Sequence, residues 1–252
     1  MNTSKGLQEK WVQDGVWHKV DSLGHEALSE FVTAQLLKNC VQLPPTFVNY
    51  EICKLDDGRI ACRSKDFLQQ GEMYISLERL YAAKMQGASL AKVLSTMEDV
   101  TQRIKHTVEF VERNTGLNKF GSYLTFLLEL DALLLNEDRH THNIGIVYDT
   151  KTDSYRVSPI FDNGLALLAD HNDYHGDVYM DIEKVHAKPF SQSFDEQVDC
   201  AESLYGQQLQ LNQFRNIFPI IDRCKMFYDD DLVERIKTAL REQHRKYRYF
   251  GN

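Results

Sequence analysis

A polar loop of carboxylate and amide side chains follows the most apolar helix-like stretch of the chain. Residues 133–147 read LLLNEDRHTHNIGIV, so Asn143 comes five residues after Asp138, and a second acidic turn follows at Asp162. Phosphoryl transfer needs one carboxylate at the acceptor hydroxyl and oxygen ligands that hold Mg²⁺ on the phosphates. The pattern therefore predicts a phosphoryl-transfer site in which Asp138 faces the hydroxyl, and Asn143 and Asp162 bind Mg²⁺.

Two motifs in this region carry a family resemblance. The first is N-x-D-R-H-x-x-N at 136–143 and the second is FDNG at 161–164. Together they resemble the catalytic and metal-binding loops of the HipA-type serine/threonine kinases, whose D-R-H-x-x-N core is shared with the phosphatidylinositol kinases. Ordinary protein kinases have the order H-R-D and a D-F-G metal loop; here His140 follows the aspartate and Asn163 replaces the phenylalanine.

The resemblance implies an α+β, two-lobed protein-kinase-like fold, with a small antiparallel β lobe that carries one helix and a mostly helical large lobe. It also implies that Asp138 and His140 belong to the catalytic loop, where we expect His140 to hold the loop through hydrogen bonds. Near the start of the chain, residues 3–10 read TSKGLQEK. This segment resembles the Ser-x-x-Gly-x-Gln-x-Lys phosphate loop of the same family, with Thr3 at the position of the serine. The implied nucleotide-binding residues are Thr3, Ser4, Gly6, Gln8 and Lys10.

A hairpin signal, Asp14-Gly15, follows this segment and predicts paired strands over 7–12 and 16–20. A two-residue turn would place Lys10 opposite Lys19, which is destabilising unless an anion lies between them. A nucleotide triphosphate would be such an anion, so Lys19 is the candidate for the lysine that binds the α- and β-phosphates. An ordinary solvated lysine is the alternative, and taken alone this segment favours that alternative for Lys10.

Apolar residues at helical spacing predict an amphipathic helix over 22–38 that carries Glu26 and Glu30. A kinase needs one helix glutamate to hold the strand lysine, and Glu30 is our choice. Three β-like runs follow, at 46–54, 59–64 and 73–77, and complete an expected five-stranded sheet.

The stretch 73–80 would then pair with adenine, and Glu78 would contact the sugar or this hinge, although a surface glutamate is the alternative. Residues 81–252 are expected to be mainly helical. The expected domains are therefore a nucleotide-binding lobe over 1–80 and a catalytic, helical lobe over 81–252.

Composition limits the partners and the compartment. The formal net charge is -8, which argues against a broad direct nucleic-acid surface. The sequence contains no apolar run of 18 residues, and its start lacks the layout of a signal peptide, so we expect a cytoplasmic protein without a membrane partner. The five cysteines are scattered without a C-x-x-C, which suggests neither a disulfide framework nor a zinc site.

The resemblance implies an ATP- and Mg²⁺-dependent serine/threonine protein kinase that phosphorylates itself at Thr3 or Ser4. It further suggests the toxin of a toxin–antitoxin system, with an antitoxin or another regulatory protein as partner, while the protein substrate stays unspecified. Two alternatives remain open. One is a small-molecule or lipid kinase, and the other is a nucleotide-binding pseudokinase that acts as an interaction module. Intact Lys19, Asp138, Asn143 and Asp162 favour the enzyme.

Overall fold

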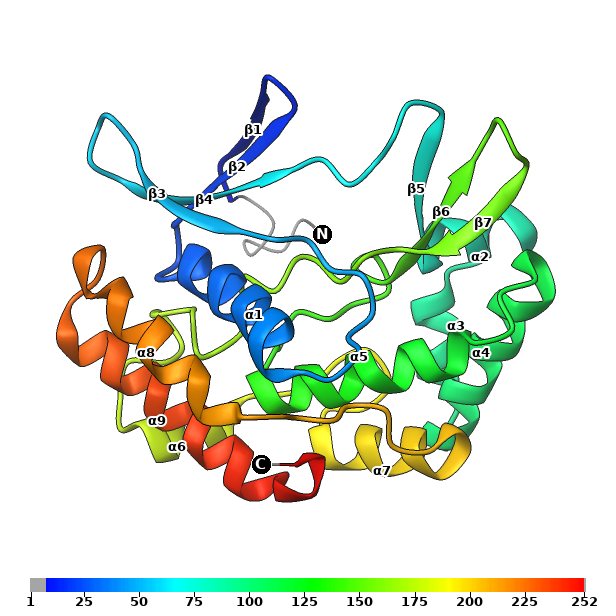
Figure 1. Ribbon diagram of the computed structural model, residues 1–252. Coiled ribbons are helices and arrows are strands. Elements are labelled where there is room, and N and C mark those ends of the chain that lie inside the picture. The colour runs from blue at the N-terminus through cyan, green and yellow to red at the C-terminus, as the bar shows by residue number, and fades with distance from the viewer. Residues whose placement is uncertain (1–7, 252) are drawn as a thin grey trace. The chain divides into compact units, whose positions relative to one another are not determined.

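The computed structural model describes residues 8–251, which form two compact units (Figure 1). The first unit contains residues 8–67, Phe161–Val185 and 210–251. The second contains Leu68–Ile160 and His186–Leu209. Each unit combines a small antiparallel sheet with helices, so the chain is α+β as the sequence predicted.

The sheet of the first unit begins with the hairpin that the sequence predicted. Strands β1 (Lys10–Gln13) and β2 (Val16–Val20) are joined by Asp14 and Gly15, with φ of 52° and 75°. Two positive φ angles are what a type I′ hairpin turn requires, and this turn matches the twist of the strands. In the resulting register Lys10 lies opposite Lys19, as expected.

Strands β3 (Glu51–Lys54) and β4 (Ile60–Lys65) complete this sheet in the order β1-β2-β4-β3. Helix α1 (Glu26–Cys40) covers one face, where Cys62 of β4 joins a buried cluster with residues of the helix. Because Lys19 lies opposite Cys62 in the register, and side chains alternate along a strand, Lys19 projects on the side of α1. We call the opposite side of the sheet the outer face.

Helix α1 begins at Glu26 and not at residue 22, as the periodicity suggested. The Glu26 carboxylate accepts hydrogen bonds from the backbone N–H groups of Ser22, Leu23 and Gly24. This carboxylate holds the three residues in a turn ahead of the helix. Hydrogen bonds from N–H groups to a side chain at a helix start compete with helix formation in the preceding residues.

Helices from the two later segments complete the first unit. An ion pair between Arg235 of α9 and Asp181 of α6 joins two of them, and Lys237 of α9 binds Asp222 of α8. These elements are α6 (Val178–Lys184), η2 (Phe214–Asn216), α8 (Ile217–Asp222), η3 (Arg223–Met226), α9 (Asp230–Lys246) and η4 (Arg248–Phe250).

The second unit has a sheet of its own, in the order β5-β6-β7. Its strands are β5 (Glu72–Ser76), β6 (Gly145–Asp149) and β7 (Ser154–Val157). The expectation of one five-stranded sheet that includes residues 73–77 was therefore wrong. The β-like run predicted the strand, but β5 pairs with β6, a partner some seventy residues later in the chain.

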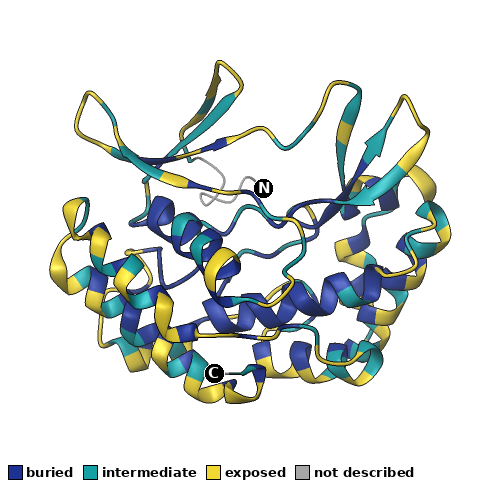
Figure 2. Ribbon diagram, viewed as in Figure 1, coloured by how far each residue is buried: buried dark blue, intermediate teal, exposed yellow. Residues whose placement is uncertain are grey.

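Helix α5 (Phe120–Leu134) is the core of the second unit and is buried along almost its whole length (Figure 2). It packs against α4 (Val100–Thr115) and α7 (Phe194–Tyr205), and the shorter helices are α2 (Leu77–Lys84) and α3 (Leu90–Thr96). At Gly121 a Cβ atom would lie 2.6 Å from the Tyr205 ring, so glycine allows α5 and α7 to pack closely.

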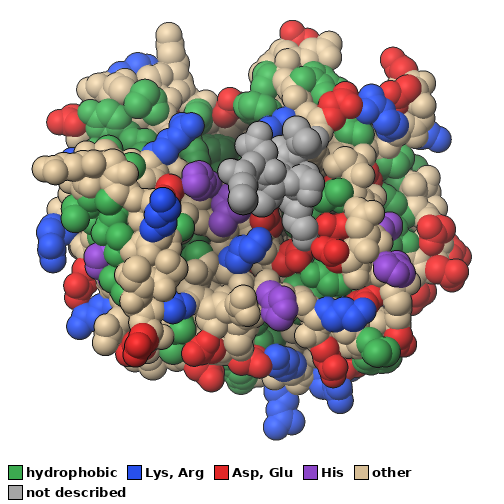
Figure 3. Space-filling view, turned by 180° about the vertical axis from the view of Figure 1, so that it is seen from behind, with side chains coloured by type: hydrophobic (Ala, Val, Ile, Leu, Met, Phe, Trp, Pro, Cys, Tyr) green, Lys and Arg blue, Asp and Glu red, His purple; other side chains and the backbone are tan. Residues whose placement is uncertain are grey.

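The two units differ from the expected division into residues 1–80 and 81–252. Residues 68–80 belong to the second unit, and two segments after residue 160 return to the first. Among the described residues, no helix is both long and apolar enough to cross a membrane. Acidic and basic side chains are interspersed over the described part of the face shown in Figure 3, with no broad basic patch there.

Candidate active site

Lys19 lies at the centre of a charged cluster in the first unit. Its Nζ atom is 2.7 Å from Oε1 of Glu30 on α1 and 2.8 Å from Oδ1 of Asp162. The Glu30 side chain is fully buried, whereas that of Asp162 is 37% exposed. The structure thus pairs Lys19 with Glu30, the helix glutamate that the sequence analysis chose over Glu26, and brings Asp162 to the same ammonium.

The surroundings of Lys19 stabilise its protonated, charged form. Burial alone would lower the pKa of Lys19, but the carboxylates of Asp162 and Glu30 outweigh it and raise the pKa well above its usual value. The ammonium also lies 5.5 Å from the ring centroid of Tyr50, where a cation is attracted to the ring. Lys19 is therefore a fixed cation that can receive phosphate oxygens.

The segment that carries Asp162 is fastened to α1. The backbone N–H of Asn163 donates to Oε2 of Glu30 at 2.9 Å, and the Ser29 hydroxyl donates to the carbonyl of Ala166. One turn earlier on the chain, the buried ring of His25 contacts the carbonyl of Leu167 at 3.0 Å. Asp162 has a φ of 59°, a conformation that costs energy for a residue other than glycine. These bonds fix the Asp162 carboxylate beside Lys19.

The catalytic-type loop is positioned by the end of α5 in the second unit. The buried carboxylate of Asp131 accepts hydrogen bonds from Arg139 Nε at 2.8 Å and from the Asn136 amide at 2.9 Å. Burial raises the pKa of Asp131, although Arg139 opposes this shift. The Asn136 side-chain oxygen then accepts the N–H of Asp138 at 3.2 Å. A buried ion pair thus holds the loop from within.

Asp138 has polar neighbours that all lie in the second unit. The Asn143 amide nitrogen donates to the backbone carbonyl of Asp138 at 3.0 Å. Lys188 Nζ lies 3.2 Å from Asp138 Oδ1, and His140 Nε2 lies 3.8 Å from Oδ2. His140 also packs edge-on against His142. Asp138, His140 and Asn143 of the catalytic-type loop are therefore brought together, and Lys188 joins them.

The donor groups fit a hard divalent cation. Because the Asn143 nitrogen is used by Asp138, the amide orientation presents its oxygen as a ligand atom. Asp162 supplies a partly exposed carboxylate. Mg²⁺ is commonly bound by one or two carboxylates together with amide oxygens and substrate phosphates. Asn143 and Asp162 therefore each offer an oxygen of the kind that Mg²⁺ takes.

The predicted phosphate loop is tested only in part. Thr3, Ser4 and Gly6 lie outside the described residues. The Gln8 side-chain amide donates to the carbonyl of Val20 at 2.9 Å, so it fastens the segment before β1 to the end of β2. Lys10 is exposed. The anions beside Lys19 are Glu30 and Asp162, which offset the repulsion that the facing lysines would cause.

The expected adenine hinge, residues 73–80, begins with the edge strand of the second sheet. The backbone of β5 pairs with β6, and residues 77–80 begin helix α2. Glu78 Oε2 accepts hydrogen bonds from the Thr141 hydroxyl at 3.0 Å and from the N–H of Ala91 at 3.1 Å. Glu78 thus joins α3 to the catalytic-type loop.

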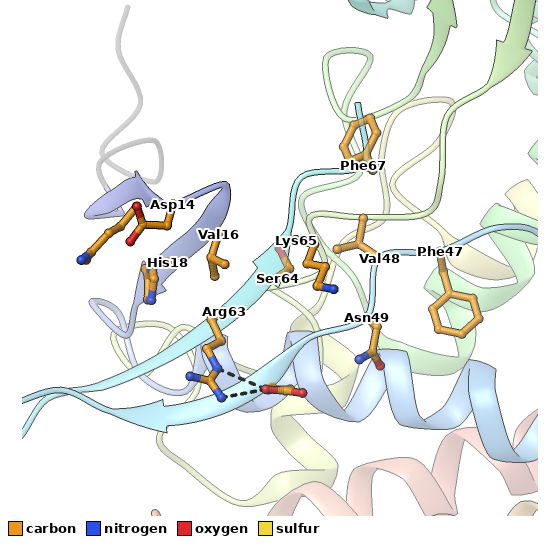
Figure 4. Close-up of a pocket in the computed structure, with 12 residues that line it drawn as sticks. Asp14, Val16, His18, Phe47, Val48, Asn49, Arg63, Ser64, Lys65 and Phe67 are labelled. Atoms are coloured by element: carbon orange, nitrogen blue, oxygen red, sulfur yellow. Dashed lines mark hydrogen bonds and ion pairs between the residues drawn. The ribbon is translucent and has the colours of Figure 1, made fainter. Parts of the chain in front are cut away.

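A hollow of about 860 Å³ lies beside the first sheet (Figure 4). Val16, His18 and Lys65 line it, as does Arg63, which forms an ion pair with Glu51. Val16 lies opposite Lys65 in the sheet, His18 lies opposite Arg63, and Arg63 lies opposite Glu51. Val48 and Phe67, which belong to the apolar cluster on the α1 side, also line the hollow, so it is not confined to the outer face.

Two functional neighbours were missed by the sequence analysis. Asp131 could have been found, because a lone aspartate in the apolar run LLELDALLL must have a buried partner. Lys188 gives no such signal, since it follows Asp138 by fifty residues in a segment without a recognisable motif. Only the fold brings it to the loop.

Comparison with known proteins identifies the fold. No protein-family model and no curated protein sequence matches the chain. CtkA of Helicobacter pylori, described as a proinflammatory kinase, is similar to it with a TM-score of 0.66 and 16% identity, over 95% of this chain and 90% of CtkA. The chain has the fold of a HipA/CtkA-like kinase.

A second solved structure supports this fold with lower structural and sequence similarity. HipA of Shewanella oneidensis, from a toxin–antitoxin complex of HipA, HipB and operator DNA, is similar with a TM-score of 0.53 and 14% identity. The match covers 96% of this chain but 64% of that one, so the chain spans less than two thirds of this relative. The kinase-like fold predicted from the two sequence motifs is confirmed.

Proposed function

We propose that the chain is an ATP- and Mg²⁺-dependent serine/threonine protein kinase of the HipA-like kind. The observation that carries this proposal is the bridge from Lys19 to both Glu30 and Asp162. Active kinases require a strand lysine held by a helix glutamate, and an aspartate that holds the metal. Here both requirements meet at one lysine.

Each residue has a distinct part in the proposed reaction. Lys19 binds the α- and β-phosphates of the nucleotide, and Glu30 keeps its ammonium in place. Asn143 and Asp162 hold Mg²⁺, which when bound neutralises charge on the phosphates. Asp138 orients the acceptor hydroxyl and accepts its proton.

The wider role follows from the family likeness and is part of the same proposal. We infer that the kinase phosphorylates itself at Thr3 or Ser4, as the similarity of residues 3–10 to the family's phosphate loop suggests. We also propose a cytoplasmic toxin whose activity is restrained by an antitoxin or another regulatory protein. The printed descriptions of CtkA as a kinase and of HipA as part of a toxin–antitoxin system support this direction.

The test is incubation with labelled ATP and Mg²⁺, followed by intact-mass and peptide mass spectrometry. The natural protein is compared with Asp138→Asn and Asp162→Asn, both with and without a cell lysate as acceptor. Asp199→Asn, an exposed position on α7, is the matched control. We expect phosphate on serine or threonine with the natural protein and the control, and none with the two site variants.

Other outcomes point to the alternatives. Nucleotide binding without any transfer, to the protein itself or to the lysate, would contradict the enzyme and favour a pseudokinase. Transfer to a lipid or a small molecule alone would contradict the protein-kinase assignment but keep the phosphotransferase chemistry. Transfer that survives both site substitutions would show that these residues do not form the active site.

A further inference from the structure

Lys188 is a cation held beside the candidate catalytic carboxylate. Its Nζ lies 3.2 Å from Asp138 Oδ1, and both residues belong to the second unit. The lysine side chain is 46% exposed and the aspartate side chain 23% exposed, so solvent and an incoming molecule can reach the pair. Such exposure distinguishes this ion pair from the buried pair of Arg139 and Asp131 in the same unit.

The backbone around Lys188 is firmly held. The N–H of Ala187 donates to the carbonyl of Gln192, and the N–H of Phe190 donates to the Gln197 side chain at 2.8 Å. The carbonyl of Phe190 accepts from Arg103, and the Phe190 side chain is fully buried. A turn with this many anchors places the base of the Lys188 side chain at a fixed point, while its four-carbon stem leaves the ammonium able to move.

The arginine of the catalytic-type loop is not available for the same task. The Arg139 side chain is fully buried, and two of its nitrogens bind the Asp131 carboxylate. Phosphoryl transfer gains most from fixed positive charge at the transferring group. Among the described residues of the second unit, Lys188 is the lysine that forms an ion pair with Asp138.

We propose, resting on the kinase function above, that Lys188 is a catalytic residue that contacts the transferring phosphoryl group. An acceptor hydroxyl bound to Asp138 lies about 3 Å from the carboxylate, which brings the phosphoryl group within reach of the Lys188 ammonium. Without substrate, Lys188 pairs with Asp138. During transfer the ammonium moves to the phosphoryl oxygens.

The charge changes of the reaction favour this movement. A bond forms between the acceptor oxygen and the γ-phosphorus, the bond from that phosphorus to the oxygen of the departing ADP breaks, and the hydroxyl proton passes to Asp138. Negative charge is spread over the oxygens of the phosphoryl group as it passes between the two oxygens, and Lys188 lies 3.2 Å from Asp138 on the acceptor side. The ammonium is then attracted most strongly by the transferring group, and it stabilises the transition state more than the ground state.

The test compares Lys188→Met and Lys188→Arg with Lys105→Met. Lys105 forms an exposed i,i+4 pair with Glu109 at 3.8 Å and is the matched control. For each protein we would measure kcat and KM for ATP, nucleotide affinity, the melting temperature, and binding of ADP with aluminium fluoride and Mg²⁺. We expect Lys188→Met to lower kcat by about 100-fold, with ATP affinity within about twofold.

The same variant should bind ADP with aluminium fluoride more weakly in similar measure, because this complex mimics the transferring group. Lys188→Arg should recover at least a tenth of the natural kcat, and the control should match the natural protein. Unchanged or increased kcat in Lys188→Met would overturn the role of Lys188 alone. A lower melting temperature with equal loss in both Lys188 variants would assign it a structural role. No transfer by the natural protein would instead overturn the kinase function, and this inference with it.

Discussion

Lys19 is held by two carboxylates that differ in their surroundings. Glu30 is fully buried and also accepts the N–H of Asn163, whereas Asp162 is more than one-third exposed. A buried carboxylate needs its cation because an unpaired charge in the interior is costly. An exposed carboxylate can exchange its cation for a metal ion at much lower cost. The same lysine thus has one structural partner and one partner suited to the reaction.

Replacing Lys19 tests both partners. In Lys19→Met the Glu30 charge loses its counter-ion, which should lower the free energy of unfolding by about 3 kcal/mol. Phosphate transfer should fall by about 100-fold or more, since a fixed cation at the phosphates is lost. Urea unfolding measures the free energy of unfolding, and a labelled-ATP assay on the same preparation measures phosphate transfer.

The double variant Lys19→Met with Glu30→Gln separates the two effects. A neutral amide removes the unpaired buried charge, so we expect most of the lost stability to return while transfer stays absent. Recovery of transfer in the double variant would contradict the phosphate-binding role of Lys19.

Asp21 gives a pH-dependent contribution to stability. Its carboxylate accepts hydrogen bonds from the N–H of Ala27 and from the Tyr228 hydroxyl, and burial raises its pKa from 3.8 to about 7. Because the folded state binds the proton more tightly, this group stabilises the fold below pH 3.8, and the contribution is lost as pH rises towards 7. Asp21→Asn imitates the protonated form.

We therefore expect the natural protein to lose stability relative to Asp21→Asn as pH rises from 4 to 8. The measurement is the difference in the free energy of unfolding between the two proteins at each pH, which cancels the other titrating groups. A difference that is constant, or that grows in favour of the natural protein, would contradict the raised pKa.

At the scale of elements, the end of α5 determines where the catalytic-type loop lies. The sequence predicted this helix and its loop because apolar residues recur at helical spacing and stop at Asn136. It did not predict that Asp131, one turn before the helix end, would hold both Arg139 and Asn136. Periodicity indicates which residues are buried but not which polar groups pair across a loop.

Asp131→Asn tests this anchor. The change leaves the buried Arg139 guanidinium opposite a neutral amide, and the expected loss in the free energy of unfolding is about 3 kcal/mol or more. Transfer should fall as well, because Asp138 loses its support. Glu109→Gln, in an exposed pair on α4, should change stability by less than about 1 kcal/mol. A similarly small loss in Asp131→Asn would contradict the proposed anchor.

At the scale of the whole molecule, the first unit is assembled from three separate segments of the chain. Residues 161–185 return to it directly after the second sheet, and residues 210–251 return after α7. Such a unit leaves no linker for composition to reveal, which explains why the expected boundary at residue 80 differs from the observed units. The strand at 73–77 was recognised as a β-like run, but such a run does not identify a partner strand, so its place in the second sheet could not be predicted.

Mg²⁺ and ATP should stabilise the natural protein together, since Mg²⁺ is commonly bound by substrate phosphates together with protein oxygens. At a free nucleotide concentration of 100 times Kd, the expected gain is about 2.7 kcal/mol. For a chain of this length that gain corresponds to a rise in melting temperature of roughly 5–10 °C. EDTA should remove the greater part of this rise, which calorimetry or dye-monitored melting would measure.

Variants of the site residues show which side chains contribute to the Mg²⁺-dependent part of this stabilisation. Asn143→Ala and Asp162→Asn should lose the Mg²⁺-dependent part of the shift, because each removes an expected metal ligand. Asp138→Asn should keep it while losing transfer, because its carboxylate is assigned to the acceptor hydroxyl. An equal shift with and without Mg²⁺ would contradict the metal assignment. Removing the group that binds the metal abolishes the metal-dependent rise in melting temperature. If that rise is lost in Asp138→Asn but kept in Asn143→Ala, Asp138 is the metal ligand and Asn143 is not.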